Sequence, residues 1–264
     1  MIHESANIHP SSIIEDGAIV GPNCKIGPFC VIGKNVRLDS GNILHSHIVI
    51  NGHTTIGKNN EFFQFCSIGE VNQDMKYKNE PTELIVGNGN TFHECCTVHR
   101  GTVQDNGKTI VGDENWIMAY VHIGHDSIIG NNTIMANNVT LGGHINVGDR
   151  VYIAGCAAIH QFCRIGAYAG IAGGALIEKD VPPFIFAQGD RKNQVRGVHE
   201  VQAKRSGNFT EEDLRAIKEV YKLIYKSDKL LKDIIPEIEE KAKVNAVLIP
   251  FVTFFQESKR GLVR

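Results

Sequence analysis

The hydrophobic pattern of this chain repeats every six residues. An apolar residue stands at every sixth position from 8 to 68, again from 86 to 98, and then from 111 to 177, and glycine often follows it. Neither the 3.6-residue period of a helix nor the alternation of a strand produces this spacing. A hexapeptide solenoid does, because each hexad is a short strand and a turn, and three hexads close a triangular coil of about 18 residues.

The repeat predicts a parallel β-helix whose interior is filled by the leading apolar residue of each hexad. The fifth residue of each hexad is mostly small and is expected inside, near a corner. Coils that stack at the strand spacing of about 4.8 Å give about nine coils and a prism of about 40 Å. Five cysteines occupy the fifth position and are predicted to be buried core residues: Cys24, Cys30, Cys66, Cys96 and Cys163.

Two segments interrupt the repeat. Glu70 to Leu84 is polar and out of phase, and residues 103–110 form a shorter insertion. Loops on rigid scaffolds often carry function, although a surface excursion without function explains these segments about as well.

The repeat ends at Pro182-Pro183, and a helical pattern follows. Thr210 before three acidic residues predicts a helix N-terminus, and apolar residues at helical spacing come next. Further helices are expected at about 229–244 and 245–259. We predict a β-helix domain of residues 1–190 and a helical domain of residues 191–264.

Composition narrows the classes of protein. The chain has 264 residues and a formal net charge of −2, so it lacks the basic excess of a nucleic-acid-binding protein. It has no apolar run of about 18 residues, hence no expected transmembrane segment, and its start does not resemble a secretory signal. Seven cysteines without a Cys-x-x-Cys pair fit reduced thiols and a cytoplasmic location.

The 18-residue coil predicts which residues stack on one another. His125 should lie near Gly143 and His144 of the next coil, and these near His160 and Gln161 of the coil after that. His122 belongs on the neighbouring corner. A cluster of outward-facing histidines is therefore expected on one region of the prism.

His125 is the third residue of its hexad, so its ring should point outward. Asp126 stands beside it, and an imidazole oriented by a carboxylate is suited to general-base catalysis. Gly143 would leave space beside the ring, and its exposed N–H group is suited to a developing oxyanion.

Two other readings of the histidines stay open. Four of them offer neutral nitrogens to zinc, as in the γ-class carbonic anhydrases: His122, His125, His144 and His160. The long helical tail is unlike that class, and we predict no metal and no other cofactor. The second reading is a trimeric scaffold without catalytic activity, in which the histidines only stabilise stacked turns.

Several motifs resemble the UDP-N-acetylglucosamine O-acyltransferases, hexapeptide-repeat enzymes that begin lipid A synthesis. The resemblance covers nearly the whole chain, and its motifs lie at residues 67–77, 99–102, 122–126, 142–144, 159–166, 180–183, 187–189, 221–225 and 260–264. It implies a left-handed parallel β-helix with a C-terminal α-helical domain, in a homotrimer. It also implies transfer of a 3-hydroxyacyl chain from acyl carrier protein to the 3-hydroxyl of UDP-N-acetylglucosamine.

The resemblance implies roles for single residues. His125 would be the base, Asp126 would orient it, and the Gly143 N–H group would stabilise the tetrahedral intermediate. Residues of the first insertion would reach the substrate from a neighbouring subunit: Gln73, Asp74 and Lys76. The cleft for sugar and pantetheine would be lined by His122, His144, His160 and Gln161.

The last implied positions concern the acyl chain and the nucleotide. Gly173 takes the place of the residue that blocks the far end of the acyl groove, and a glycine there implies a long chain of about 14 carbons. Arg205 keeps a guanidinium for a phosphate, whereas His199, Gln202 and Ser206 depart from the family's Asn, Gly and Arg. Acylation of a 3-amino sugar analogue, which gives an amide, stays open.

Overall fold

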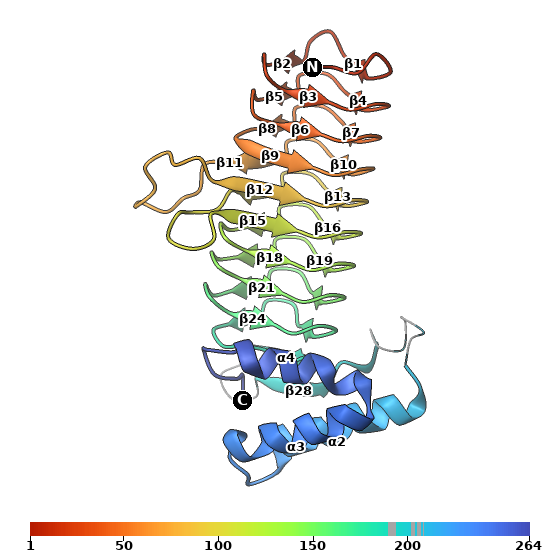
Figure 1. The fold of residues 1–264 in the computed structure, drawn as a ribbon, viewed down its shortest axis with the longest axis vertical. Helices are drawn as coiled ribbons and strands as arrows, with labels where there is room; N and C mark the ends of the chain where they lie inside the picture. The colour runs from red at the N-terminus through yellow and green to blue at the C-terminus, as the bar shows by residue number, and fades with distance from the viewer. Residues whose placement is uncertain (190–193, 202–203, 205–206, 208) are drawn as a thin grey trace.

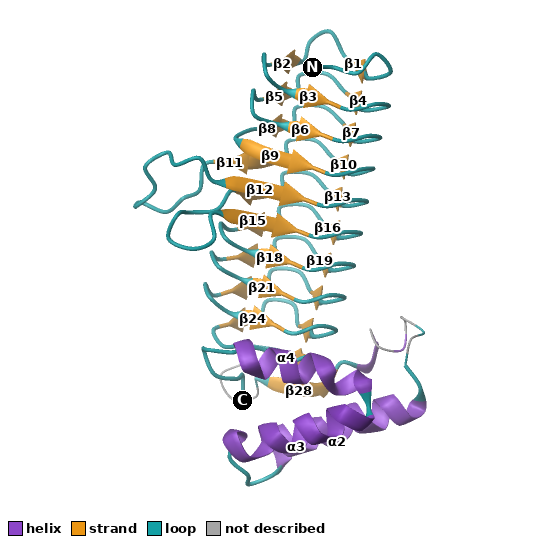
Figure 2. Ribbon diagram, viewed as in Figure 1, coloured by secondary structure: helices purple, strands orange, loops and turns teal. Residues whose placement is uncertain are grey.

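The chain forms three walls of short strands around a shared apolar core. The computed structural model describes residues 1–264 except 190–193, 202, 203, 205, 206 and 208. The walls are three sheets of 11, 9 and 8 strands within the described residues, and the helices lie at the end opposite the N-terminus (Figures 1 and 2).

Each sheet takes every third strand of the repeat. The first sheet contains β1 (Asn7–Ile8), β4 (Lys25–Ile26), β7 (Ile43–Leu44), β10 (Glu61–Phe62), β13 (Thr91–Phe92), β16 (Trp116–Ile117), β19 (Ile134–Met135), β22 (Tyr152–Ile153), β25 (Gly170–Ile171), β27 (Ile185–Ala187) and β28 (Val195–Val198). The second contains β2 (Ile13–Ile14), β5 (Val31–Ile32), β8 (Val49–Ile50), β11 (Ser67–Glu70), β14 (Thr97–His99), β17 (His122–Ile123), β20 (Thr140–Leu141), β23 (Ala158–Ile159) and β26 (Leu176–Ile177). The third contains β3 (Ile19–Val20), β6 (Arg37–Leu38), β9 (His53–Ile56), β12 (Glu83–Val86), β15 (Lys108–Val111), β18 (Ile128–Ile129), β21 (Asn146–Val147) and β24 (Arg164–Ile165).

The strand register confirms the 18-residue coil. Ile123 pairs in parallel with Leu141, and Leu141 pairs with Ile159. The leading apolar residues from Val20 to Ile177 are all buried, and so are the five cysteines that the repeat placed inside. The fold is therefore the predicted left-handed parallel β-helix with a C-terminal helical part.

Both insertions leave the prism at the same corner. The segment between β11 and β12 and the segment between β14 and β15 connect the second sheet to the third in consecutive coils. Figure 1 shows both loops projecting from the same side of the prism. They lengthen the pairing step from 18 residues, so Ser67 pairs with Thr97 and Thr97 pairs with His122. The sheets continue without a break, and the added residues lie outside the prism.

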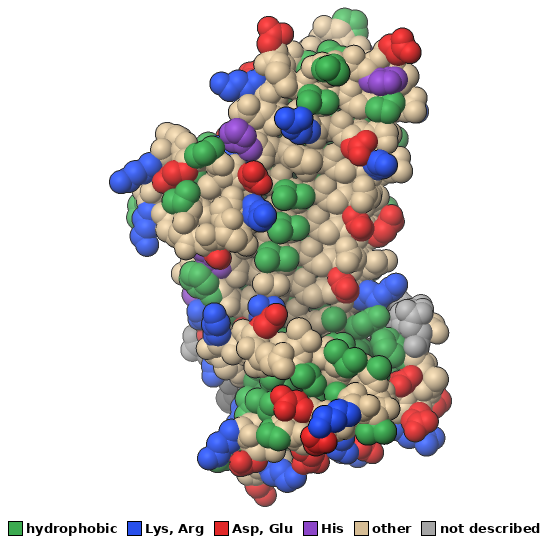
Figure 3. All heavy atoms as spheres, in the orientation of Figure 1, with side chains coloured by type: hydrophobic (Ala, Val, Ile, Leu, Met, Phe, Trp, Pro, Cys, Tyr) green, Lys and Arg blue, Asp and Glu red, His purple; other side chains and the backbone are tan. Residues whose placement is uncertain are grey.

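The helical part closes the far end of the prism. Its elements are α2 (Glu211–Lys226), α3 (Leu231–Val244), η1 (Ala246–Leu248) and α4 (Ile249–Glu257). Thr210 caps α2 as predicted, in a capping box with Asp213. On the face in Figure 3, acidic and basic side chains gather over these helices. The expected domain boundary between residues 190 and 191 lies outside the described residues. Among the helices that the structure describes, none is long and apolar enough to cross a membrane.

The C-terminal tail is fixed to the last coil by Asp180. This buried carboxylate accepts hydrogen bonds from the backbone N–H of Arg164 in the prism and from three groups of the tail, namely Ser258 Oγ, Lys259 N and Arg260 N. The tail is thereby held against the prism wall.

Candidate active site

The candidate site lies on the corner that carries both insertions. The chain passes from the second sheet to the third there in every coil, and successive coils place His125, His144 and Gln161 along it. They line a cavity of about 980 Å³. We call this edge of the prism the site corner.

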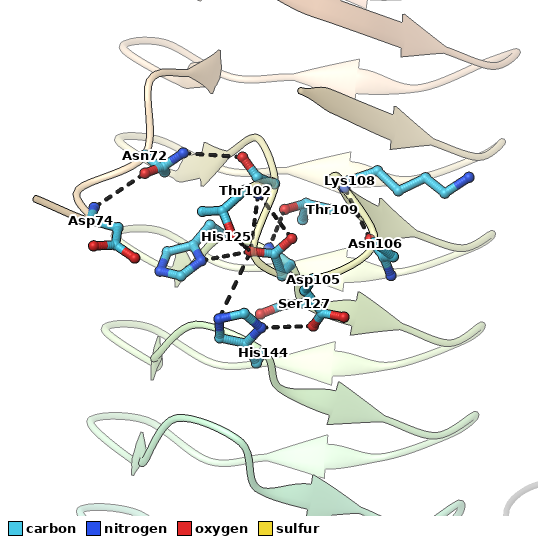
Figure 4. Close-up of polar contacts among 12 residues, drawn as sticks. Asn72, Asp74, Thr102, Asp105, Asn106, Lys108, Thr109, His125, Ser127 and His144 are labelled. Atoms are coloured by element: carbon cyan, nitrogen blue, oxygen red, sulfur yellow. Dashed lines mark hydrogen bonds and ion pairs between the residues drawn. The ribbon is translucent and has the colours of Figure 1, made fainter. Parts of the chain in front are cut away.

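His125 and Asp126 form a hydrogen-bonded pair at the site corner (Figure 4). His125 Nδ1 lies 2.8 Å from Asp126 Oδ2. Thr102 donates its N–H to both Asp126 oxygens, at 2.9 and 3.0 Å, and its hydroxyl to Oδ2 at 2.7 Å. Thr109 Oγ1 accepts the Asp126 N–H at 2.8 Å. Asp126 is left-handed with φ 58° and is held there by these contacts.

Asp126 is ionised in this setting, which determines the tautomer of His125. Burial alone would raise the pKa of Asp126, but the hydrogen bonds from His125 and Thr102 outweigh it, so the pKa lies below its ordinary value. A carboxylate only accepts hydrogen bonds, so His125 Nδ1 is the donor. Nε2 of His125 keeps its lone pair in the neutral ring and is the nitrogen left for a substrate proton.

Gly143 lies against the His125 ring, as the stacking predicted. A Cβ atom at this position would lie 2.6 Å from both Cε1 and Nε2 of His125, so only glycine fits without movement of the ring. The Gly143 N–H group donates no hydrogen bond to any residue that the structure describes. A base and an unused backbone donor thus stand side by side.

His144 is held in a second imidazole–carboxylate contact. Its Nδ1 lies 2.7 Å from Asp105 Oδ2, and its Nε2 lies 3.9 Å from Asp126 Oδ2. The ring stacks on Phe162 at 4.4 Å and meets the His125 ring edge-on at 5.0 Å between centroids. Asp105 belongs to the second insertion, and the sequence repeat gave no sign of this contact.

His99 and His122 extend the cluster toward the N-terminal end. Their rings meet edge-on at 5.0 Å, and His122 Nδ1 lies 2.7 Å from Thr97 Oγ1. Burial, followed by the neighbouring His122 and His125, lowers the pKa of His99 to about 4. Burial and His125 also lower the pKa of His122. These two side chains line the cavity as neutral imidazoles at physiological pH.

The low pKa of His99 predicts acid-sensitive stability. The unfolded chain binds a proton at His99 near pH 6.5, whereas the folded protein binds it only near pH 4. Stability is therefore complete above pH 6.5 and falls as the pH drops toward 4, by about 2 kcal/mol between pH 7 and pH 5 from this residue. Denaturant unfolding at fixed protein concentration should show a smaller loss over this range in His99→Gln than in the parent. Equal losses in the two proteins would contradict the assignment.

The first insertion folds over the site of its own chain. Gln73, Asp74 and Lys76 line the same cavity as His125. The resemblance implied that they reach the substrate of a neighbouring subunit, and here they border the cavity of their own chain. The reason is local, because hydrogen bonds hold the loop against its own prism.

Arg100 and Asn72 make that connection. Arg100 Nη1 donates to the Gly69 carbonyl at 3.0 Å and Nη2 to the Tyr77 hydroxyl at 3.2 Å. Asn72 Nδ2 donates to the Gly101 carbonyl at 3.0 Å, and its Oδ1 accepts the Asp74 N–H. Sequence reasoning missed the anchoring role of Arg100, although the residue lies inside the quoted 99–102 motif.

Other predicted residues lie away from the cavity. His160 is exposed, with Nδ1 3.1 Å from the Gln161 carbonyl, and does not line the cavity. Gly173 is exposed on the corner between the first and second sheets. His199 is buried against Phe186 and lines a separate cavity of about 630 Å³. Arg205, Gln202 and Ser206 lie outside the described residues.

Lys259 is a further lining residue that the sequence did not indicate. It belongs to the C-terminal tail, and its backbone N–H donates to Asp180, which is 79 residues earlier in the chain. Because this contact docks the tail on the prism, Lys259 reaches the site cavity. No periodic signal relates it to the histidines.

The zinc reading receives limited support from the geometry. Within the described chain, ligand atoms of His125, Asp126 and His144 lie within 4.8 Å of one another. His160 is not among them, and Asp126 Oδ2 already accepts hydrogen bonds from Thr102 and His125. The expected set of four histidines therefore does not converge on one point.

The fold and the site together define a hexapeptide-repeat acyltransferase. Profiles described as "Bacterial transferase hexapeptide (six repeats)" match residues 1–34 and 108–143, and "Udp N-acetylglucosamine O-acyltransferase; Domain 2" matches residues 180–263. The crystal structure of the UDP-N-acetylglucosamine acyltransferase of Francisella novicida is 41% identical, with a TM-score of 0.81 over 100% of this chain and 94% of that one. The Acinetobacter baumannii protein is 42% identical (TM-score 0.82, 100% and 99%), and the Campylobacter jejuni acyltransferase is 31% identical (TM-score 0.90, 97% and 98%). The chain belongs to the UDP-N-acetylglucosamine O-acyltransferase family.

Proposed function

We propose that this protein transfers a 3-hydroxyacyl chain from acyl carrier protein to the 3-hydroxyl of UDP-N-acetylglucosamine. It does so in the cytoplasm as a homotrimer, in the first step of lipid A biosynthesis. The observation that carries the proposal is the His125–Asp126 pair, which opens into a cavity beside the unused Gly143 N–H group. Family membership supports the substrate class.

The reaction needs a base because a sugar hydroxyl is a poor nucleophile at neutral pH. His125 Nε2 takes the 3-hydroxyl proton while the oxygen attacks the thioester carbonyl. The Gly143 N–H group stabilises the oxyanion that forms. Collapse of the intermediate expels the pantetheine sulfur, which receives the proton from the His125 imidazolium. Asp126 stabilises that cation through its hydrogen bond to Nδ1.

The rest of the cavity suits a sugar nucleotide. Gln73, Asp74 and His144 present polar groups near the base, and Lys76 adds a positive charge for a phosphate. The 630 Å³ cavity beside His199, with Arg196, lies on a different wall of the prism. In the proposed homotrimer that wall of one subunit faces the site corner of the next, which gives His199 a place at the substrate. His160 stands beside Gln161 on the site corner of its own chain.

The acyl chain would lie in the groove between prisms, and Gly173 leaves that groove open. Among the described residues, a Cβ atom at Gly173 would have within 4 Å the Gly155 carbonyl oxygen at 3.4 Å and the Ala154 Cβ atom at 3.9 Å, which are ordinary contacts that leave room beside it. A long chain of about 14 carbons is the expected substrate.

The test is acyl transfer by the purified protein with two acceptors. Acyl carrier proteins charged with a series of 3-hydroxyacyl chains are supplied with UDP-N-acetylglucosamine or with its 3-amino analogue. We expect ester formation on UDP-N-acetylglucosamine, fastest with chains of about 14 carbons and at least about tenfold slower with chains several methylenes shorter or longer. Faster amide formation on the 3-amino analogue would replace the proposal by the N-acyltransferase alternative. Transfer to neither acceptor, without binding of either, would favour the scaffold reading.

A further inference from the structure

The second insertion spans three coils of the site corner. Just before it stands Thr102, three residues after β14 ends at His99, and the N–H and hydroxyl groups of Thr102 hold Asp126 in the next coil. The insertion then brings Asp105 to His144, one coil further along, at 2.7 Å between Oδ2 and Nδ1. Figure 4 shows both contacts on the same side of the corner. One short loop therefore sets two imidazole–carboxylate contacts.

The Asp105 contact determines which His144 nitrogen carries the proton and which can accept a hydrogen bond. A carboxylate cannot donate, so His144 Nδ1 carries the proton toward Asp105. In the neutral ring, Nε2 is then an acceptor, and the ring is held in place by stacking on Phe162. A free imidazole prefers the opposite tautomer, with the proton on Nε2, so the orientation depends on the partner at Nδ1.

A role in overall stability does not explain the contact. The Asp105 side chain is 47% exposed, and exposed pairs of this kind add little to folding. The His144 side chain is only 12% exposed and borders the cavity. The change that Asp105 makes is therefore at Nε2, the ring nitrogen that lies 3.9 Å from Asp126 Oδ2 beside the cavity.

We propose that Asp105 is a positioning residue that fixes His144 with Nε2 as a hydrogen-bond acceptor for the acceptor substrate. This deepens the proposed function and rests on it. The group that fits is a hydroxyl or amide N–H of the sugar beside the reacting hydroxyl, because His144 Nε2 lies near the Asp126–His125 pair. The second insertion thereby contributes to the choice of acceptor.

The test compares Asp105→Ala, Asp105→Asn and Asn106→Ala. Asn106 is the adjacent exposed residue, and its Oδ1 accepts the Lys108 N–H within the same loop, so it controls for disturbance of the loop. Nitrogen-15 NMR of the unliganded protein, labelled at histidine, reports the tautomer of His144. We expect the Nε2–H form to become the major one in Asp105→Ala, and the parent tautomer to persist in Asp105→Asn and Asn106→Ala.

Kinetics separate positioning from folding. We expect KM for UDP-N-acetylglucosamine to rise about tenfold in Asp105→Ala, with kcat lowered less than about threefold, and a smaller change in Asp105→Asn. In a His144→Ala background, Asp105→Ala should change KM by less than about twofold. An unchanged His144 tautomer in Asp105→Ala, or an equal KM effect in the His144→Ala background, would overturn the proposal. The NMR readout needs no turnover, so loss of the proposed acyl transfer activity and loss of this inference are distinguishable.

Discussion

Replacing His125 with alanine is expected to lower kcat for acyl transfer about 10³-fold or more. The variant removes the group whose Nε2 takes the hydroxyl proton and returns it to the leaving sulfur, and general-base catalysis is commonly worth 10² to 10⁴. The Gly143 N–H group and the binding contacts remain, so KM for UDP-N-acetylglucosamine should change far less than kcat. Single-turnover transfer from a charged acyl carrier protein measures the chemical step directly.

The fold should survive this substitution because His125 lies outside the apolar core. His3→Ala is the matched control, since it removes an exposed imidazole at the far end of the prism, where the ring hydrogen-bonds to Ser5 Oγ and the Ser5 N–H group. We expect His3→Ala to keep turnover within about twofold of the parent, and both variants to keep the parent's thermal unfolding. Turnover of His125→Ala near that of the parent would exclude His125 as the base.

The fold could be predicted because the apolar positions that determine it repeat regularly along the sequence. An apolar residue every sixth position fixes which side chains enter the coil, and the pairing of Ile123 with Leu141 then follows from three hexads per coil. The same count placed Gly143 beside His125 and buried Cys96, without any alignment of other chains. The left-handedness was predicted from the family resemblance, because a six-residue period is the same for a left-handed and a right-handed coil.

The contacts that the sequence did not reveal involve residues outside the period. Asp105 and His144 are 39 residues apart and meet because an off-register loop extends from the coil of β14, past that of β17, to that of β20. Arg100 ties the first insertion to its own prism, which the register could not show. Lys259 depends on docking of the tail by Asp180. Each of these contacts forms between segments whose spacing in the sequence does not follow the six-residue repeat, so the repeat could not predict it.

Some roles that the family resemblance implied also differ from what the structure of one chain shows. Gln73 and Asp74 were expected to serve a neighbouring subunit, yet their loop lines its own chain's cavity. Gly173 lies on the corner between the first and second sheets, and His199 lines a separate cavity at the first sheet, so neither borders the site cavity. Under the proposed function, the acyl groove and the nucleotide end would need a second copy, whereas His125 and Asp126 meet within one chain.

Gly143 provides the sharpest test of the close contact between coils. An alanine Cβ would stand 2.6 Å from Nε2 and Cε1 of His125, a separation that real Cβ atoms do not show, so the ring must move. Its movement would lengthen the 2.8 Å contact between His125 Nδ1 and Asp126 and would place a methyl group in front of the basic nitrogen. The N–H group at position 143 is retained, so the variant isolates the effect on the base.

We expect Gly143→Ala to lower kcat by about 10²-fold, since misplacement of a catalytic group by about 1 Å has this size of effect. The prism should stay folded, because the backbone at Gly143 is not in the left-handed region. Gly33→Ala is the matched control: its added Cβ would meet the Asn51 side-chain oxygen at 2.7 Å, which can rotate away, and the next atom only at 3.5 Å. We expect that control to keep kcat within about twofold of the parent. If Gly143→Ala did the same, the His125 ring would have room that the stacked coils do not give it, and the assignment of base and oxyanion donor to adjacent coils would be wrong.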